Sequence, residues 1–378
     1  MRRLRLGVIP LVLAAGPSPA PAGIQPAVSH AARAAVSDSL DDGPHVYWAD
    51  EGHAIVFYLC HDAAPAERFA VRDTLAFRGL CADSATTYRV PARPPRPPRD
   101  TWEGVPRILA ISDIHGEYDA MVAFLERAGV IDAAGRWSWG DGHLVVVGDV
   151  VDRGARVTEC LWLLHRLEQE AERAGGRVHV LLGNHEMMVM RNDVRYVHAR
   201  YTNGIVRYLG VRYPDLFAPE TELGRWLRSK PFVLKLNDVV FTHGGLAPEL
   251  VRRGLDLRTM NTIGRESLDL SSVALFFSDV PALLLGSAGP LWYRGYFRGG
   301  SPGDSTVSAG ELDSLLEFYG ATSVVVGHTP LGGVQRFHDG RLFAIEPSAH
   351  ARGAIEGLLW TDGAFSVVRA TGAVEPLN

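Results

Sequence analysis

Five short apolar runs along the chain each end on side chains of the kinds that bind metal ions. An apolar run of about four to six residues indicates a buried strand. The runs are RILAIS before Asp113 and His115, HLVVVG before Asp149, VHVLLG before Asn184 and His185, DVVFT before His243, and TSVVVG before His328. Such endings in succession predict that several strand ends bring these side chains together at one rim of a sheet.

The segments between these strands have the periodicity of helices. One helical pattern, YDAMVAFLERAGV, follows His115, and a second continues through Glu172. Residues 187–229 are expected to be mostly helical, and residues 255–290 form a mixed insertion. Further strands are expected near residues 232–242, 323–327, 342–346 and 356–370. This alternation of strands and helices predicts a layered α/β (α+β) fold.

The chain before this core has a different pattern, with short β-prone runs separated by polar turns. We expect residues 44–92 to form a small antiparallel β unit. The stretch PARPPRPPRD after it is either a stiff polyproline linker or an ordered strap on the core. The expected parts are a signal peptide (1–22), a flexible lead (23–43), the β unit (44–92), a Pro-rich linker (93–104) and a main domain (105–372).

The role of the β unit has two interpretations. It is either a binding module of the cell envelope that carries a second domain, or a structural part of that domain. We expect the second, because about 50 residues of short strands make a marginal independent fold.

The first 22 residues have the pattern of a secretory signal. Arginines at positions 2, 3 and 5 precede the apolar stretch LGVIPLVLAA, and an A-x-A cleavage pattern follows at positions 20–22. The apolar stretch is shorter than the roughly 20 residues that a membrane helix needs. We therefore expect an exported protein, periplasmic or extracellular, with no transmembrane helix in the mature chain. An uncleaved membrane anchor is the alternative.

Composition, charge and cysteines narrow the picture further. The 378 residues are 47% hydrophobic, enough for a large core. The net charge is -5 and the chain has no basic stripe, so we expect no nucleic-acid partner. Cys60 and Cys81 either form a disulfide in the oxidising compartment, worth about 3 kcal/mol, or remain two thiols. Cys160 lies in a helical pattern and is expected in the core.

The side chains at the strand ends suit a pair of metal ions. Asp113 and His115 are two residues apart, so on a strand they would point to the same side and share one metal. Asp149 can bridge two metals with its two oxygens. The remaining donors are an amide oxygen and two imidazoles, from Asn184, His243 and His328. Oxygen and imidazole donors without thiolates suit first-row ions such as Mn, Fe or Zn.

A site of this kind would act on phosphate esters. Two metals about 3.5–4 Å apart clamp a phosphate and hold a bridging hydroxide as the nucleophile. No serine or cysteine nucleophile is then required.

The motifs in which these side chains lie resemble a known family. The blocks DIHGEYD, GDVVDRG, GNHE, HGG and GH occur in this order and resemble the calcineurin-like metallophosphoesterase superfamily. The arginine of GDVVDRG indicates the phosphoprotein phosphatase branch. The stretches TELGRWLRSKP (221–231) and GPLWYRGY (289–296) resemble the bacterial Shewanella-like phosphatases. The resemblance covers residues 105–350, within the main domain.

The resemblance implies a fold, a reaction and roles for individual residues. The fold is two stacked mixed β-sheets flanked by helices. His185 would be the general acid, Asp152 would hydrogen-bond it and raise its pKa, and Arg153 and Arg294 would grip the phosphate. One metal would be held by Asp113, His115 and Asp149, and the second by Asp149, Asn184, His243 and His328.

One position departs from many superfamily members, which have a second histidine two residues after the GH histidine. Pro330 stands there, as in the phosphoprotein phosphatase branch, so the first metal has three protein ligands. Tyr293 and Tyr296 either line the pocket or pack in the core. The implied substrate is a phosphorylated protein, with a phosphotyrosine preference as in some relatives. The alternative is an exported scavenging phosphatase or nucleotide hydrolase that acts on small phosphoesters.

Overall fold

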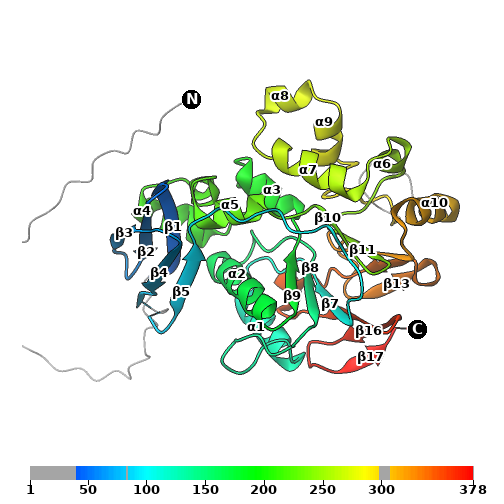
Figure 1. Ribbon diagram of the computed structural model, residues 1–378, viewed down its shortest axis with the longest axis horizontal. Coiled ribbons are helices and arrows are strands. Elements are labelled where there is room, and N and C mark those ends of the chain that lie inside the picture. The colour runs from blue at the N-terminus through cyan, green and yellow to red at the C-terminus, as the bar shows by residue number, and fades with distance from the viewer. Residues whose placement is uncertain (1–39, 82–83, 298–306, 378) are drawn as a thin grey trace, which may run out of the picture. The chain divides into compact units, whose positions relative to one another are not determined.

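Two six-stranded mixed sheets form the centre of this computed structural model, which describes residues 40–81, 84–297 and 307–377 (Figure 1). The strand orders are β13-β14-β12-β11-β10-β6 and β17-β16-β15-β7-β8-β9. The first sheet contains β6 (Thr101–Trp102), β10 (Val233–Leu236), β11 (Val239–Thr242), β12 (Ser323–Val326), β13 (Gln335–Phe337) and β14 (Leu342–Ala344). The second contains β7 (Arg107–Ile111), β8 (His143–Val146), β9 (Arg177–Val180), β15 (Gly357–Thr361), β16 (Ala364–Val368) and β17 (Val374–Pro376).

The two sheets stack face to face, and helices pack on their outer faces. Val145 of β8 lies in the buried cluster between the sheets, with Phe241 of β11 and Phe343 of β14. Its neighbours Leu144 and Val146 point the other way and lie in the second cluster, among helical side chains. This alternation follows from the two-residue period of a strand that is buried on both faces. The predicted fold of two stacked mixed sheets flanked by helices is confirmed.

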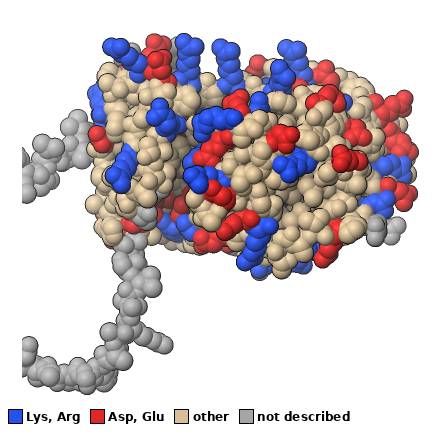
Figure 2. Space-filling model, turned by 60° about the horizontal axis from the view of Figure 1, so that its bottom comes forward, with Lys and Arg blue, Asp and Glu red and all other residues tan. Residues whose placement is uncertain are grey.

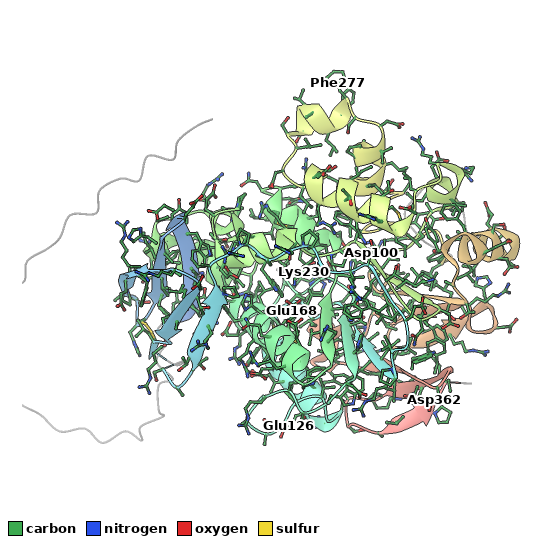
Figure 3. The ribbon with its side chains drawn as sticks, in the orientation of Figure 1. Asp100, Glu126, Glu168, Lys230, Phe277 and Asp362 are labelled. Carbon is green, nitrogen blue, oxygen red and sulfur yellow. A yellow bond between two sulfur atoms is a disulfide. The ribbon has the colours of Figure 1, made fainter. Side chains whose placement is uncertain are left out.

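The helices account for the segments between the strands. The insertion at residues 255–290, whose structure the sequence left undefined, folds as three helices, the second of which ends beside the exposed Phe277 (Figure 3). None of the described helices combines the length and the apolar character needed to cross a membrane. The helices are α1 (Tyr118–Arg127), α2 (Val157–Arg173), α3 (Asn184–Met190), α4 (Val206–Leu209), α5 (Glu222–Arg228), α6 (Pro248–Arg252), α7 (Leu257–Ser267), α8 (Ser272–Phe276), α9 (Val280–Leu285), α10 (Ala309–Tyr319) and α11 (Ala349–Arg352).

The five ligand-bearing runs become three neighbouring strands of one sheet and two of the other. β7, β8 and β9 are parallel, as are β11 and β12, so the carboxyl ends of each group meet at one edge. The segments that follow these ends carry every predicted donor, on loops except for Asn184, which begins α3. This agrees with the general position of sites in parallel sheets.

Asp113 and His115 do not lie on one side of a strand, so that prediction is wrong. β7 ends at Ile111, and both residues have left-handed backbone angles, with φ of 52° and 49°. The two side chains meet because their loop is hydrogen-bonded to the loop after β8. The Asp113 amide donates to Gly148 O over 3.1 Å and the His115 amide to Asp149 O over 2.9 Å.

The N-terminal strands form two small antiparallel sheets. One contains β1 (Asp42–Asp50), β2 (His53–Leu59) and β3 (Ala66–Ala70), and the other contains β4 (Thr74–Arg78) and β5 (Thr87–Pro91). A disulfide joins Cys60 to Cys81, whose Cα atoms are 5.7 Å apart, which confirms the paired interpretation. Cys160 is a buried free thiol, as expected. The predicted signal at residues 1–22 and nearly all of the lead lie outside the described residues.

A buried carboxylate joins these N-terminal strands to the helices of the main domain. Glu222 of α5, 2% exposed, accepts hydrogen bonds from Trp48 Nε1 (2.9 Å) and Arg225 Nε (2.5 Å) and contacts His165 Nε2 (3.0 Å). We call Glu222 and these three partners the Glu222 clamp. Its residues come from β1, α2 and α5, so the small sheets are packed against the main domain.

The end of the motif TELGRWLRSKP makes a second polar link to α2. Lys230, one of only two lysines, places Nζ 2.5 Å from Glu168 Oε1 and lies 5% exposed (Figure 3). Burial lowers the pKa of this amine, and Glu168 opposes the shift.

The Pro-rich stretch also lies against the main domain. The Arg225 guanidinium donates to the carbonyls of Pro91 and Ala92, and β6 at the end of the stretch pairs in parallel with β10. The stretch therefore makes the contacts of an ordered strap. At the other end of the chain, β17 extends its sheet beyond residue 372, where we expected the domain to end.

Charged side chains of both signs are scattered among uncharged residues on one face of the molecule (Figure 2). On the face in Figure 2, lysine and arginine are interspersed with aspartate and glutamate. That the protein has no nucleic-acid partner stays a prediction.

Candidate metal centre and active site

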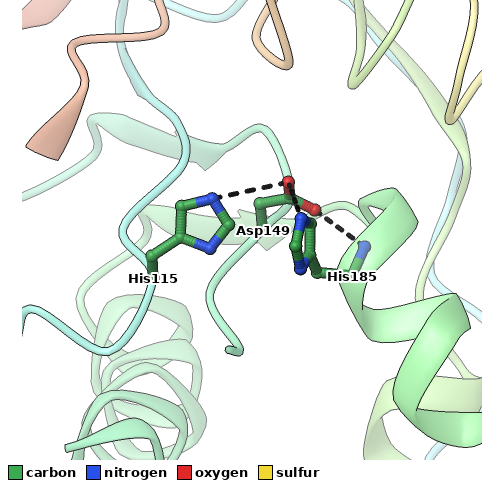
Figure 4. Close-up of side chains that lie close together, drawn as sticks. All are labelled: His115, Asp149 and His185. Atoms are coloured by element: carbon green, nitrogen blue, oxygen red, sulfur yellow. Dashed lines mark hydrogen bonds and ion pairs between the residues drawn. The ribbon is translucent and has the colours of Figure 1, made fainter. Parts of the chain in front are cut away.

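Asp149 lies at the centre of the site, 1% exposed, at the start of the loop after β8. Its Oδ2 is 3.7 Å from His115 Nε2 and 3.8 Å from His185 Nε2 (Figure 4). The same oxygen is 3.1 Å from His243 Nε2. Burial alone would raise the pKa of Asp149. The surrounding imidazoles, His243 first, outweigh burial and hold this pKa well below its ordinary value.

The candidate donors form two groups that share Asp149. Ligand atoms of His115, Asp149 and His185 lie within 4.8 Å of one another, and so do those of Asp149, His243 and His328. The other two predicted donors adjoin these groups. Asp113 Oδ1 is 3.9 Å from His115 Nε2, and Asn184 Oδ1 is 3.0 Å from His243 Nε2. The other five predicted ligands therefore gather around the shared carboxylate of Asp149.

Hydrogen bonds orient two of the imidazoles for metal binding. His115 Nδ1 donates to Val151 O over 2.9 Å, and His243 Nδ1 donates to Val147 O over 2.7 Å. A carbonyl only accepts, so the proton of each neutral ring is on Nδ1 and Nε2 faces Asp149. In many metal sites a partner of this kind fixes the tautomer of the ligating histidine. Carboxylate, amide and imidazole donors held in this way fit a pair of first-row ions.

The pKa values of these groups reflect burial and mutual charge. Burial lowers the pKa of His115 to about 3, against the opposing charge of Asp149, so its ring is neutral as a ligand requires. Burial also raises the pKa of Asp113 to about 7, and Asp149 and Glu346 add to this shift. For His243, the carboxylates of Asp149 and Asp113 outweigh burial and raise the pKa to about 9.

A second buried carboxylate, which the sequence reasoning missed, holds the loop that carries Asp149. Glu186, 1% exposed, accepts from the amides of Asp149 (3.0 Å), Val150 (2.8 Å), Val151 (3.0 Å) and Gly183 (2.7 Å). We call this set of bonds the Glu186 staple. Its signal was present in the sequence, because Glu186 is the last residue of GNHE.

The predicted general acid and its partner are in contact. His185 Nδ1 lies 2.7 Å from Asp152 Oδ2, so the proton on this nitrogen points at the carboxylate and Nε2 faces the site. Burial would lower the pKa of His185, but Asp149 and Asp152 raise it above its ordinary value. Asp152 is 0% exposed and has a left-handed φ of 69°, a strained backbone of the kind found at functional sites.

A cavity of about 180 Å³ is lined by His185 and by four of the predicted ligands, Asp113, Asp149, Asn184 and His328. Arg153 and Arg294 both line it, from loops that are far apart in sequence, and Arg294 Nη2 is 3.5 Å from His328 Nδ1. Tyr293 and Tyr296 are buried and do not line it. Three lining residues besides the predicted ones were missed by the sequence reasoning, namely Tyr196, Trp292 and Glu346.

Among these three lining residues, only Trp292 had a usable signal, since it lies in GPLWYRGY two residues before Arg294. A larger cavity, of about 260 Å³, lies beside the Cys60–Cys81 bridge and α2, but the imidazoles are absent from its lining. The chemistry of the site therefore belongs to the smaller cavity.

Comparison with known proteins agrees with this geometry. Residues 106–332 match the family described as calcineurin-like phosphoesterase. The chain is 29% identical to Shewanella-like protein phosphatase 1 of Plasmodium berghei, over 60% of this chain and 62% of that one. It is 43% identical to Shewanella-like protein phosphatase 2 of Arabidopsis thaliana over 96 residues, 25% of each chain.

A solved structure is similar over nearly the whole described chain. It is the cold-active protein-tyrosine phosphatase of a psychrophilic Shewanella species, with a TM-score of 0.82 and 32% identity, over 90% of this chain and 100% of that one. This chain belongs to the calcineurin-like phosphoesterase family, is similar within it to the Shewanella-like protein phosphatases, and is a metal-dependent phosphoesterase.

Proposed function

We propose that the protein hydrolyses phosphomonoesters with two metal ions that share Asp149. The observation that carries this proposal is the position of the Asp149 carboxylate between two groups of donors, beside the His185–Asp152 pair. Asp113, His115 and Asp149 would hold one ion. The second would be held by Asp149, Asn184, His243 and His328.

When bound, the two ions would polarise the phosphoryl group and lower the pKa of the attacking water. Arg153 and Arg294 would bind the phosphoryl oxygens, a task for which the guanidinium fork is suited. His185 would donate the proton of Nε2 to the leaving oxygen. Asp152 would keep that proton in place by accepting from Nδ1 and favouring the imidazolium.

The substrate class we propose is a phosphorylated protein, with a preference for phosphotyrosine. The similar solved structure is named a protein-tyrosine phosphatase. In addition, Tyr196 and Trp292 place aromatic rings at the cavity. Small phosphoesters and nucleotides are the alternative substrates.

We also propose that the ions are Mn, Fe or Zn, and that the protein acts outside the cytoplasm. The donor chemistry supports the first of these proposals. The signal pattern of residues 1–22 and the disulfide between Cys60 and Cys81 support the second.

A substrate panel tests the proposed function. Purified protein with added Mn²⁺ is assayed on phosphotyrosyl and phosphoseryl peptides, nucleotides and sugar phosphates, and values of kcat/KM are compared. We expect the phosphotyrosyl peptide to give the highest value. The His185→Ala variant should lose at least about 100-fold in kcat, as befits loss of a general acid. The control is His53→Ala, at a half-exposed ring on β2 far from the site in sequence. Wild-type protein that cleaves nucleotides better than every phosphopeptide would contradict the substrate class.

A further inference from the structure

The proposed function uses Tyr196, whose ring packs on the predicted general acid, only as one of two aromatic residues at the cavity. We infer that Tyr196 is a specificity-determining residue. Its ring forms the wall against which an aromatic leaving group packs, so that aryl phosphomonoesters are favoured over alkyl ones. The inference rests on the proposed function and deepens it.

The position of the leaving group follows from the position of the acid. The leaving oxygen must come within hydrogen-bond reach of the group that protonates it, about 2.6–3.2 Å. His185 Nε2 is that group, because Nδ1 is engaged with Asp152. The ring of Tyr196 has its centroid 5.1 Å from that of His185, at an interplanar angle of 52°. The first atoms beyond the leaving oxygen therefore pass beside Tyr196.

The ring of Tyr196 is accessible but held in place. The residue is 47% exposed and lines the cavity, so part of the ring is free to meet a ligand. Its carbonyl accepts from the Arg153 amide over 2.8 Å, which ties its backbone to the loop of the phosphate-binding arginine. The guanidinium carbons of Arg153 and Arg195 lie 5.8 Å and 5.7 Å from the ring centroid. Two cations near one ring restrict its movement.

Arg195 is itself paired with a neighbouring carboxylate. Its guanidinium donates to both carboxylate oxygens of Asp193, at 2.7–3.1 Å. The aromatic wall thus needs little ordering when a ligand binds, which favours binding.

The other aromatic residue of the cavity has a different neighbour. Trp292 packs edge-on against His328, with centroids 5.9 Å apart and rings at 90°. It therefore borders the candidate metal ligands rather than the acid. Tyr196 is the ring beside the leaving group.

The chemistry of the leaving group decides the preference. A phosphotyrosyl ester carries a phenyl ring directly on the leaving oxygen, and this ring can stack offset or edge-to-face on Tyr196. A phosphoseryl ester carries one methylene group there, so it gains little binding energy from packing on Tyr196. At the upper end of its usual range, the interaction energy of a single aromatic pair corresponds to about a tenfold difference in kcat/KM.

The test compares two peptides of identical flanking sequence, one phosphotyrosyl and one phosphoseryl, on full-length metal-loaded enzyme. Tyr196→Leu should lower the ratio of their kcat/KM values about tenfold, and Tyr196→Phe should preserve it. The control is Tyr208→Leu, at a similarly exposed tyrosine of α4 that does not line the cavity. Competitive inhibition separates the wall from the phosphate site. For Tyr196→Leu, the inhibition constant of phenylphosphonate should rise about tenfold, and that of inorganic phosphate should stay within twofold.

An unchanged peptide ratio in Tyr196→Leu overturns the inference. So does an equal loss on both peptides, because Tyr196 would then only position His185. Either result leaves the proposed function standing, provided that the wild type cleaves phosphomonoesters. A wild-type enzyme that cleaves no monoester refutes the proposed function, and the inference with it.

Discussion

The Glu186 staple offers a sharp test of how the site is held together. In Glu186→Gln, one carboxylate oxygen becomes an amide NH₂ of nearly the same size. Each oxygen of Glu186 accepts two backbone amides, Oε1 those of Val150 and Val151 and Oε2 those of Asp149 and Gly183. Whichever way the new side chain turns, two buried N–H groups lose their acceptor and face a donor.

The magnitude follows from the number of orphaned groups. A buried donor left without a partner costs about 1–3 kcal/mol, so two cost about 2–6 kcal/mol of unfolding free energy. The loop they belong to carries Asp149, so its loosening should also weaken metal binding. Loss of such outer contacts costs about 10–100-fold in metal affinity.

Two assays measure these effects. Urea unfolding, with and without Mn²⁺, gives the stability loss, and chelator competition gives the metal affinity. The control is Glu51→Gln, at an exposed glutamate in the turn after β1. A Glu186→Gln protein with the stability and metal affinity of the Glu51→Gln control would refute the reasoning.

Three further predictions concern parts of the fold away from the metal ligands. Glu222→Leu should lower the unfolding free energy by about 1–3 kcal/mol in urea denaturation, because it removes the acceptor of Trp48 Nε1 and the ion pair of the partly buried Arg225, which keeps its bonds to the carbonyls of Pro91 and Ala92; a loss below 1 kcal/mol would contradict this. Cys60→Ser should lower the unfolding free energy by about 3 kcal/mol under non-reducing conditions and leave kcat/KM for an aryl phosphate within twofold. A large loss of activity would contradict this, because the disulfide would then be needed to hold the site. Burial lowers the pKa of His143 to about 4 and that of His179 well below its ordinary value, so both rings are neutral in the folded protein at neutral pH. Unfolded chains then bind more protons than folded ones, and the contribution of His143 to stability, about 1–3 kcal/mol, should be lost as the pH falls from about 6.5 to 4. Urea midpoints against pH for wild type and His143→Gln check this, and parallel curves would contradict it.

The sequence was most informative where one local pattern had one structural solution. The run HLVVVG became β8 because a stretch that is apolar at every position can be buried on both faces only as an inner strand. The donors after the five runs converged because parallel strands bring their carboxyl ends together. No single motif predicted this convergence. The order and repetition of the five motifs predicted it.

The sequence was least informative where contacts between distant segments decide the structure. Asp113 and His115 meet through left-handed loop geometry rather than strand alternation, and nothing local specifies that. Tyr196 lies at the site because its carbonyl accepts a hydrogen bond from the Arg153 amide. The two residues are 43 positions apart, and no sequence motif marks this contact. The Pro-rich stretch leads into β6 because the chain there pairs with β10. The composition of the stretch does not predict this pairing.

The central claim is that Asp149 is shared by two metal ions, and metal titration tests it most directly. Protein stripped with chelator is titrated with Mn²⁺ while bound metal and phosphatase activity are followed together. The account predicts that wild type binds two ions per chain and gains full activity only with the second. It also predicts that Asp149→Asn loses tight binding at both positions and at least about 100-fold in kcat/KM. Full activity with one ion per chain, or an Asp149→Asn variant that binds two ions and turns over normally, would contradict it.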